Sequence, residues 1–259
     1  MKIALVGYGR MGHAVEAQAR DREHEIVARL GRGELGGRAR DLAEHLSDAD
    51  VAIDFTVGEL TPRVIEAAGL AGTDLVVGTT GFGDDAHEAM ESAGGIGIVH
   101  GPNFSIGVHV FFRIAGQAAR LIDGVGGYDT HVNEAHHRHK RDHPSGTAWR
   151  LADLLVERLG DKTQWRSGPP AEQPDPATLY VTSVRAGEIP GSHTVGFDGV
   201  HDRIEVTHEA RGRDGFASGA LRAAEWIHGR DGVFTFTEVI DRILDLDTDD
   251  ADSGEERDE

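Results

Sequence analysis

A basic, histidine-rich segment is the strongest candidate for chemistry in this sequence. Residues 136–141 read HHRHKR, so three imidazoles and three permanent positive charges follow one another directly. An imidazolium such as that of His136 can deliver a proton near neutral pH, and an ammonium such as that of Lys140 can hold a carboxylate or stabilise a developing anion. The segment therefore predicts a site that binds and protonates an anion.

A helix start follows this segment and adds a second place for an anion. Pro144, Ser145, Gly146 and Thr147 open a stretch with helical periodicity, and the free backbone N–H groups at a helix N-terminus bind anions. Because this start lies so close to the histidines, residues 134–148 predict a proton donor beside two carboxylate contacts.

Two other interpretations of the histidines stay open. The first is a surface loop without chemistry. The second is a metal site that uses His137 and His139, which share a face if this segment is a strand. No third ligand with a typical metal spacing accompanies them, so a metal is not part of our prediction.

The composition of the chain narrows the classes of partner. Of 259 residues, 45 are acidic and 26 are basic, for a net charge of −19. Phosphate binding needs a basic surface, so this charge argues against nucleic acid as a partner. Lysine occurs only at positions 2, 140 and 162, and arginine supplies the other cations. This acid-rich, lysine-poor composition indicates a halophilic protein, because concentrated salt screens repulsion between surface carboxylates.

Several classes of site are missing from the sequence. The chain lacks cysteine, which excludes disulfides, thiolate metal sites and a cysteine nucleophile. No apolar stretch has the length needed to cross a bilayer, and strand-like residues begin directly after Met1. We therefore expect a cytoplasmic protein with no membrane partner.

The end of the chain is strongly acidic. From Asp245 to Glu259 it carries nine acids and one arginine, with almost no apolar residues. We expect residues 246–259 to form a disordered tail, and an acidic interaction arm is the alternative.

The first hundred residues predict a doubly wound parallel sheet of the Rossmann type. Short apolar runs alternate there with helix-like stretches, which is typical of parallel strands covered on both faces by helices. The apolar runs span residues 2–7, 25–30, 50–56, 74–80 and 95–103, and the helical stretches span 13–20, 39–46, 62–70 and 84–93. Such sheets bind ligands at the carboxyl ends of their strands, so the loops there should converge on one crevice.

The pattern changes after residue 105 and predicts a second, α+β domain. Expected helices span residues 110–122 and 146–160, a strand spans 128–137, and period-two runs span 180–187, 191–197 and 202–210. These runs predict an open, mostly antiparallel sheet. We assign residues 106–215 to this domain, and residues 1–105 with 216–245 to the dinucleotide-binding domain.

The loop after the first strand predicts a dinucleotide site. Its sequence GYGRMG, formed by Gly7, Gly9, Arg10, Met11 and Gly12 with the tyrosine between, is a GxGxxG that follows a strand and opens a helix. The first glycine allows a tight turn, the second lets the backbone approach a pyrophosphate, and the third lets helix pack on strand. A simple strand-to-helix turn is the alternative.

The end of the second strand bears on the choice of cofactor. Enzymes that use NAD carry an acid there for the ribose hydroxyl, but this strand ends in Arg29-Leu30-Gly31-Arg32-Gly33. Arg32 could meet a 2′-phosphate instead, so we predict preference for NADPH or use of both NADPH and NADH. A solvated arginine without a ligand is the alternative.

The motifs of this sequence, taken together, resemble those of the dihydrodipicolinate reductase family. The resemblance runs in order over about residues 1–245. It is carried by KIALVGYGRMG, IDFT, VVGTTGF, GPNFSIGV, EAHHRHKRDHPSGTA, VRAGEIPGSHTVGF, RIEVTHEA and FASGALRAAEWI. The pair HHRHK and PSGTA is far more specific to this family than the glycine loop.

The resemblance implies a reaction and a set of site residues. It implies reduction of a small dicarboxylate, 4-hydroxy-tetrahydrodipicolinate, in the diaminopimelate route to lysine, with oligomerisation as a homotetramer through the open sheet. His136 matches the proton donor and Lys140 the second catalytic residue. The family's substrate contacts correspond here to His137, Ser145, Gly146 and Thr147. Its cofactor contacts correspond to the glycine loop and to Gly78, Thr79, Thr80, Gly101, Pro102, Asn103 and Phe104.

Two other functions remain as rivals. A non-catalytic dinucleotide sensor would keep the fold without needing His136, Lys140 and the PSGTA turn. A dehydrogenase of another dicarboxylate, such as an aspartate dehydrogenase, would not need the HHRHK segment.

Overall fold

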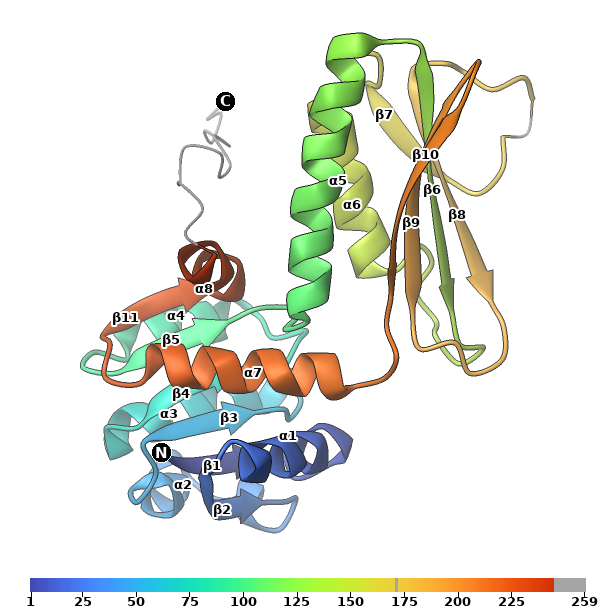
Figure 1. The fold of residues 1–259 in the computed structure, drawn as a ribbon. Coiled ribbons are helices and arrows are strands. Elements are labelled where there is room, and N and C mark those ends of the chain that lie inside the picture. Colours follow the sequence, from blue (N-terminus) through green and yellow to red (C-terminus); the bar gives the residue numbers. More distant parts are fainter. Residues whose placement is uncertain (171, 245–259) are drawn as a thin grey trace. The chain divides into compact units, whose positions relative to one another are not determined.

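The computed structural model describes residues 1–170 and 172–244, which form two compact units with separate sheets and cores (Figure 1). The first unit combines Met1–Ile106 with a segment that starts at Arg213, and the second spans Gly107–Gly212. The predicted tail at 246–259 lies outside the described residues.

The first unit contains a six-stranded parallel sheet in the order β11-β5-β4-β3-β1-β2. Its strands are β1 Lys2–Val6, β2 Glu25–Leu30, β3 Val51–Asp54, β4 Asp74–Val77, β5 Gly97–His100 and β11 Gly232–Thr235. The predicted doubly wound fold is therefore confirmed. The sixth strand, β11, was not predicted. It has four residues at the edge of the sheet, paired with β5, and Gly232 and Val233 are exposed, so it has no continuous apolar run.

Helices cover both faces of this sheet, as Figure 1 shows. Successive strand residues point to opposite faces, so Ile3 and Leu5 pack in one core while Ala4 and Val6 pack in the other. The first core lies under α1 Arg10–Asp21, α7 Asp214–Ile227 and α8 Phe236–Ile243; the second lies under α2 Ala39–Leu46, α3 Thr61–Ala71 and α4 Asp84–Ser92. Two short 3₁₀ turns, η1 Glu34–Gly36 and η2 Gly58–Leu60, precede α2 and α3.

The second unit contains a five-stranded sheet in the order β10-β9-β6-β8-β7. Its strands are β6 Tyr128–His136, β7 Gln164–Ser167, β8 Thr178–Arg185, β9 Ser192–Gly199 and β10 Arg203–Glu209. The predicted sheet was mostly antiparallel, but the observed sheet is mixed: β10, β9 and β6 are antiparallel neighbours, whereas β6, β8 and β7 pair in parallel. The predicted runs correspond to β6, β8, β9 and β10 but did not give their directions, and the short strand β7 was not predicted.

Two helices cover one face of the second sheet, α5 Ile106–Val125 and α6 Gly146–Arg158 (Figure 1). Beneath them, Val132, Val181, Val195 and Phe197 are fully buried. The side chains of β6 alternate between this core and the opposite face, which bears polar pairs such as Asn133 with Thr182. Within the described residues, no helix is both long and apolar enough to span a membrane.

Candidate active site

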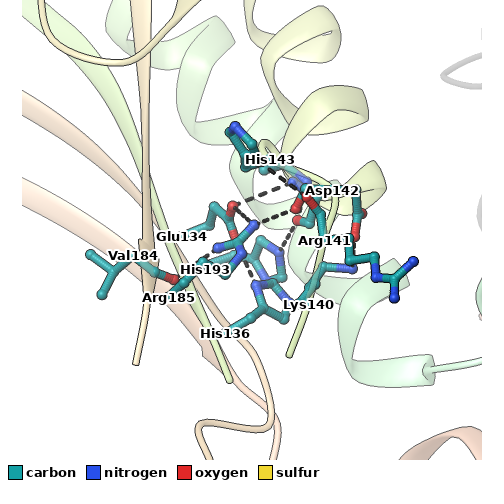
Figure 2. A network of polar contacts seen from close by, with 11 residues as sticks. Glu134, His136, Lys140, Arg141, Asp142, His143, Val184, Arg185 and His193 are labelled. Atoms are coloured by element: carbon teal, nitrogen blue, oxygen red, sulfur yellow. Dashed lines mark hydrogen bonds and ion pairs between the residues drawn. The ribbon is translucent and has the colours of Figure 1, made fainter. Parts of the chain in front are cut away.

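The central strand of the second unit, β6, presents Glu134 and His136 to one buried face. The two residues are separated by one, so the period of a strand places them on the same side. The register of β6 with its neighbouring strands places His193 of β9 opposite Glu134 and Arg185 of β8 opposite His136. Figure 2 shows these four side chains converging beside the residues that follow β6.

Glu134 is the residue of this cluster to which His136, Arg185 and Ser145 donate hydrogen bonds. Its side chain has no exposed surface, and Oε2 accepts a hydrogen bond from Nδ1 of His136. Oε1 accepts from Nη2 of Arg185 at 2.7 Å and from the Ser145 backbone N–H at 3.3 Å. Burial by itself raises the pKa of Glu134, but the hydrogen bonds from His136 and Arg185 outweigh it and hold the pKa below its ordinary value. The side chain is therefore an ionised acceptor at neutral pH.

A second histidine faces the first. The rings of His193 and His136 lie 5.1 Å apart in a T-shaped arrangement. Burial and the charge of His136 lower the pKa of His193 to about 4, so His193 is neutral when His136 is charged. Nε2 of His193 lies 3.0 Å from Oγ of Ser145.

Ser145 is held inside this network and begins α6. It is 2% exposed, and its Oγ accepts from the Ala148 backbone N–H at 3.2 Å, which makes it the N-cap of the helix. The side chain is thus occupied by protein partners. The predicted anion contact therefore falls to two backbone N–H groups at the helix start. These belong to Gly146, which is exposed and also interacts with the Asp142 carboxylate, and to Thr147, which is half-buried.

The loop after β6 holds Lys140. The loop begins with a turn, in which the His137 carbonyl accepts a hydrogen bond from the Lys140 N–H at 3.1 Å. Nζ of Lys140 lies 2.9 Å from Oδ1 of Asp142. Burial raises the pKa of Asp142, but the hydrogen bond and charge of Lys140 outweigh that and lower it. Arg185 donates to the Asp142 carbonyl at 2.6 Å, so one guanidinium ties this loop to Glu134 (Figure 2).

The alternative metal site does not have the backbone it requires. The strand ends at His136, so His137 and His139 lie in a turn rather than on one strand face. His139 is exposed, and Nδ1 of His137 is buried with no hydrogen-bond partner among the described residues.

Another group of atoms lies close enough together to bind a cation. Within the described part of the chain, ligand atoms of Glu134, His136 and His193 approach one another within 4.8 Å. The guanidinium of Arg185 shares the Glu134 carboxylate and opposes a cation there. We therefore assign no metal to it.

Gly191 provides space for the His136 ring. A Cβ at this position would lie 3.0 Å from Nε2 of His136, and its φ of +148° lies in a region that side chains rarely adopt. The ring therefore lies directly against the backbone at the start of β9.

In the first unit, the glycine loop has the geometry that a pyrophosphate needs. Gly7 has φ +89° and a Cβ there would lie 2.4 Å from the Phe55 carbonyl oxygen, whereas nothing lies within 4 Å of the Cβ position of Gly9. A Cβ on Gly12 would lie 2.9 Å from the Gly7 carbonyl oxygen. Gly9 begins α1 without a side-chain cap, which leaves the helix start to a ligand.

The other two predicted cofactor residues of this loop start α1. Arg10 is exposed, and Met11 is half-buried against the core. A pyridine dinucleotide therefore fits the glycine loop.

The loop after β4 is anchored by a buried acid. Asp54 is fully buried and accepts from the Thr56 backbone N–H at 2.9 Å and from Oγ1 of Thr79 at 3.0 Å. The Thr79 side chain is thus an anchor, whereas Thr80 is exposed. A Cβ on Gly78 would lie 2.2 Å from the Phe55 ring.

The buried Asp54 carboxyl predicts a pH effect on stability. Burial raises its pKa to about 6, above the ordinary value of about 3.9 that applies in the unfolded chain. Between these values the folded state keeps a proton that the unfolded state has lost, so the stabilising contribution is lost as pH rises from about 4 to about 6. We expect Asp54→Asn to remove this loss. Urea denaturation midpoints of variant and parent at pH 4, 5, 6 and 7 test it; a constant difference between them would contradict the prediction.

The loop after β5 contains core residues as well as exposed ones. Phe104 is 2% exposed, and its ring lies 4.5 Å from that of Phe236. Gly101 is buried, Pro102 is exposed, and Oδ1 of Asn103 accepts from the Ser105 backbone N–H at 2.8 Å. Of the four predicted cofactor residues in this loop, Phe104 therefore places its side chain in the core.

The end of β2 differs from the sequence-based expectation. Arg32 is exposed, as a ligand to a phosphate would be. The sequence showed no acid at this strand end, but Oε2 of Glu34 accepts from the Gly31 backbone N–H at 2.9 Å. A carboxylate thus reaches the strand end from η1, three residues further along the chain.

Comparisons with known proteins agree with this geometry. The model of the family "Dihydrodipicolinate reductase, N-terminus" matches residues 1–104, and "Dihydrodipicolinate reductase, C-terminus" matches residues 107–240. The chain is 42% identical to the 4-hydroxy-tetrahydrodipicolinate reductase of Alkalilimnicola ehrlichii over 266 residues, covering 92% of this chain and 98% of that one. It is 36% identical to that of Christiangramia forsetii, covering 94% and 99%.

A solved structure shares the fold. Dipicolinate-bound dihydrodipicolinate reductase from Paenisporosarcina sp. TG-14 superposes with a TM-score of 0.72 at 22% identity, covering 91% of this chain and 97% of that chain. Family models for both halves and relatives over nearly the whole length therefore confirm the resemblance seen in the motifs: the chain belongs to the dihydrodipicolinate reductase family.

Proposed function

We propose that this chain reduces 4-hydroxy-tetrahydrodipicolinate to tetrahydrodipicolinate with NADPH or NADH, in the diaminopimelate route to lysine. The observation that carries the proposal is the buried Glu134–His136 pair beside Lys140 and the start of α6. It combines a proton donor with groups that bind carboxylates, which a dicarboxylate substrate requires. The names of the relatives supply the particular substrate.

Different residues of the chain would bind the cofactor, bind the substrate and transfer the proton. The glycine loop and the open start of α1 would hold the pyrophosphate of a pyridine dinucleotide, whose nicotinamide would supply the hydride. Lys140, His137 and the backbone N–H groups of Gly146 and Thr147 hold the substrate carboxylates. The 4-hydroxyl group of the substrate leaves as water, hydride adds to the ring, and Nε2 of His136 donates a proton to the carbon next to the one that is reduced, which gives tetrahydrodipicolinate.

A coupled assay tests this function. Dihydrodipicolinate synthase generates the unstable substrate, and oxidation of NADPH or NADH is followed by absorbance. We expect turnover that pyridine-2,6-dicarboxylate inhibits, since the Paenisporosarcina relative binds dipicolinate. Absence of turnover with both cofactors would reject the proposal.

The proposal includes use of NADPH, and Arg32 supports it as an exposed cation at the end of β2. Replacing Arg32 with alanine removes a charge-assisted contact to the 2′-phosphate, so we expect the Kd for NADPH to rise about tenfold and that for NADH to change less than about twofold. Fluorescence titration measures both constants. Arg40→Ala removes another exposed charge, from α2, and is the control. An equal loss of affinity for both cofactors in Arg32→Ala would contradict this role.

We also propose a homotetramer built through the uncovered face of the second sheet, in a salt-rich cytoplasm. The supports are the sheet face without a helix in this unit and the net charge of −19 with three lysines. The small dicarboxylate is the only partner besides the cofactor that we propose.

A further inference from the structure

We infer that Glu134 is the positioning residue that assigns the transferable proton of His136 to its Nε2 atom. The inference rests on the proposed role of His136 as proton donor. It concerns a residue that does not touch the substrate and acts only through the imidazole.

The hydrogen bond between Glu134 and His136 determines which nitrogen keeps its hydrogen. An ionised carboxylate can only accept, so Nδ1 of His136 must carry the hydrogen of the bond to Oε2. In the imidazolium, the hydrogen left free to leave is then the one on Nε2. After transfer, the ring is the Nδ1–H tautomer and is ready to be protonated again at Nε2.

The surroundings of Nε2 agree with this assignment. No described residue forms a hydrogen bond with Nε2 of His136, and Gly191 lies against it without a side chain. A proton on this atom therefore has no competing acceptor within the described part of the chain.

The charges around the pair keep Glu134 ionised through the cycle. The groups that face it are His136 on the same strand, Arg185 from β8 and His193 from β9, with Lys140 in the loop (Figure 2). Arg185 is permanently charged and contacts Oε1 at 2.7 Å. His193 is neutral, as its lowered pKa requires. The carboxylate thus retains a cationic partner when His136 loses its proton.

Glu134→Gln separates positioning from packing. The amide keeps the shape, but its NH₂ group can donate to Nδ1 and stabilise the wrong tautomer. We expect kcat to fall about 10- to 100-fold, the basic limb of the kcat–pH profile to move to lower pH, and the KM for the dicarboxylate to change less than about twofold. Glu134→Asp, which keeps the charge, should restore part of kcat. Glu209→Gln, an exposed acid on β10, is the control.

The tautomer can be observed without catalysis. Long-range ¹H–¹⁵N correlation spectra of the free protein, assigned by difference with His136→Asn, report which ring nitrogen carries hydrogen at high pH. We expect the Nδ1–H form in the parent and a mixture in Glu134→Gln. An Nε2–H form in the parent overturns the inference, as does a Glu134→Gln variant with parental kcat and pH profile. If the parent has no turnover, the proposed function fails, and the spectrum still decides the tautomer.

Discussion

His136→Gln is expected to lower kcat by about a hundredfold or more and to leave the Kd for the nicotinamide cofactor within about twofold. Glutamine keeps a polar side chain beside Glu134 but has no proton to give at neutral pH. The glycine loop lies in the other unit, so the cofactor site should keep its own structure. Steady-state kinetics in the coupled assay and cofactor titration measure the two quantities.

A matched histidine controls for this substitution. His139 lies in the same segment, but its side chain is 70% exposed and takes no part in the Glu134 network. His139→Gln should keep kcat within about twofold of the parent. A loss in His136→Gln that is confined to cofactor binding would assign His136 a different role.

Gly219→Ala is expected to destabilise the first unit by about 3 kcal/mol or more. Gly219 lies within α7, and a Cβ there would be 1.7 Å from the Phe104 carbonyl oxygen and 3.1 Å from the Phe236 ring. The helix or the loop after β5 must move, and that loop carries the predicted cofactor residues 101–104. Urea denaturation and cofactor titration should show a lower midpoint and weaker binding.

Gly215→Ala is the control within the same helix. Its nearest neighbour would be Oγ of Ser105 at 3.7 Å, an ordinary contact, so the midpoint should stay within about 0.5 kcal/mol of the parent. Equal midpoints for the two variants would show that the loop yields to the new methyl group at little cost.

The fold could be predicted from local patterns because each pattern reflects burial. The apolar runs of β1, β3, β4 and β5 are buried on both faces, and their hydrophobicity is therefore continuous along the chain. Strand β11 shows no such run, since Gly232 and Val233 are exposed. The directions of β8 and β7 depend on the connections between the strands, and the alternation of side chains carries no information about them.

The site was predictable only in part for a related reason. His136 and Lys140 could be recognised because they gather in one segment of an acidic chain. Arg185 lies 51 residues beyond Glu134, and only the register of β6 with β8 brings them together. His193 was not among the predicted site residues, and it joins the site through the register of β9 with β6. The signal available in the sequence for Glu134 was an acid two residues before the candidate proton donor, which a strand places on the same face.

The alternation of side chains along β6 also limits how the length of related chains can vary. Glu134 and His136 reach the buried face only while the count of residues from Tyr128 stays in phase with the pairing to β9 and β8. One inserted or deleted residue within this strand would turn both side chains to the uncovered face and bring Ala135 inward. Insertions in the loops at either end leave that phase intact. Insertions and deletions among relatives should therefore occur in the loops before and after this nine-residue strand and not within it.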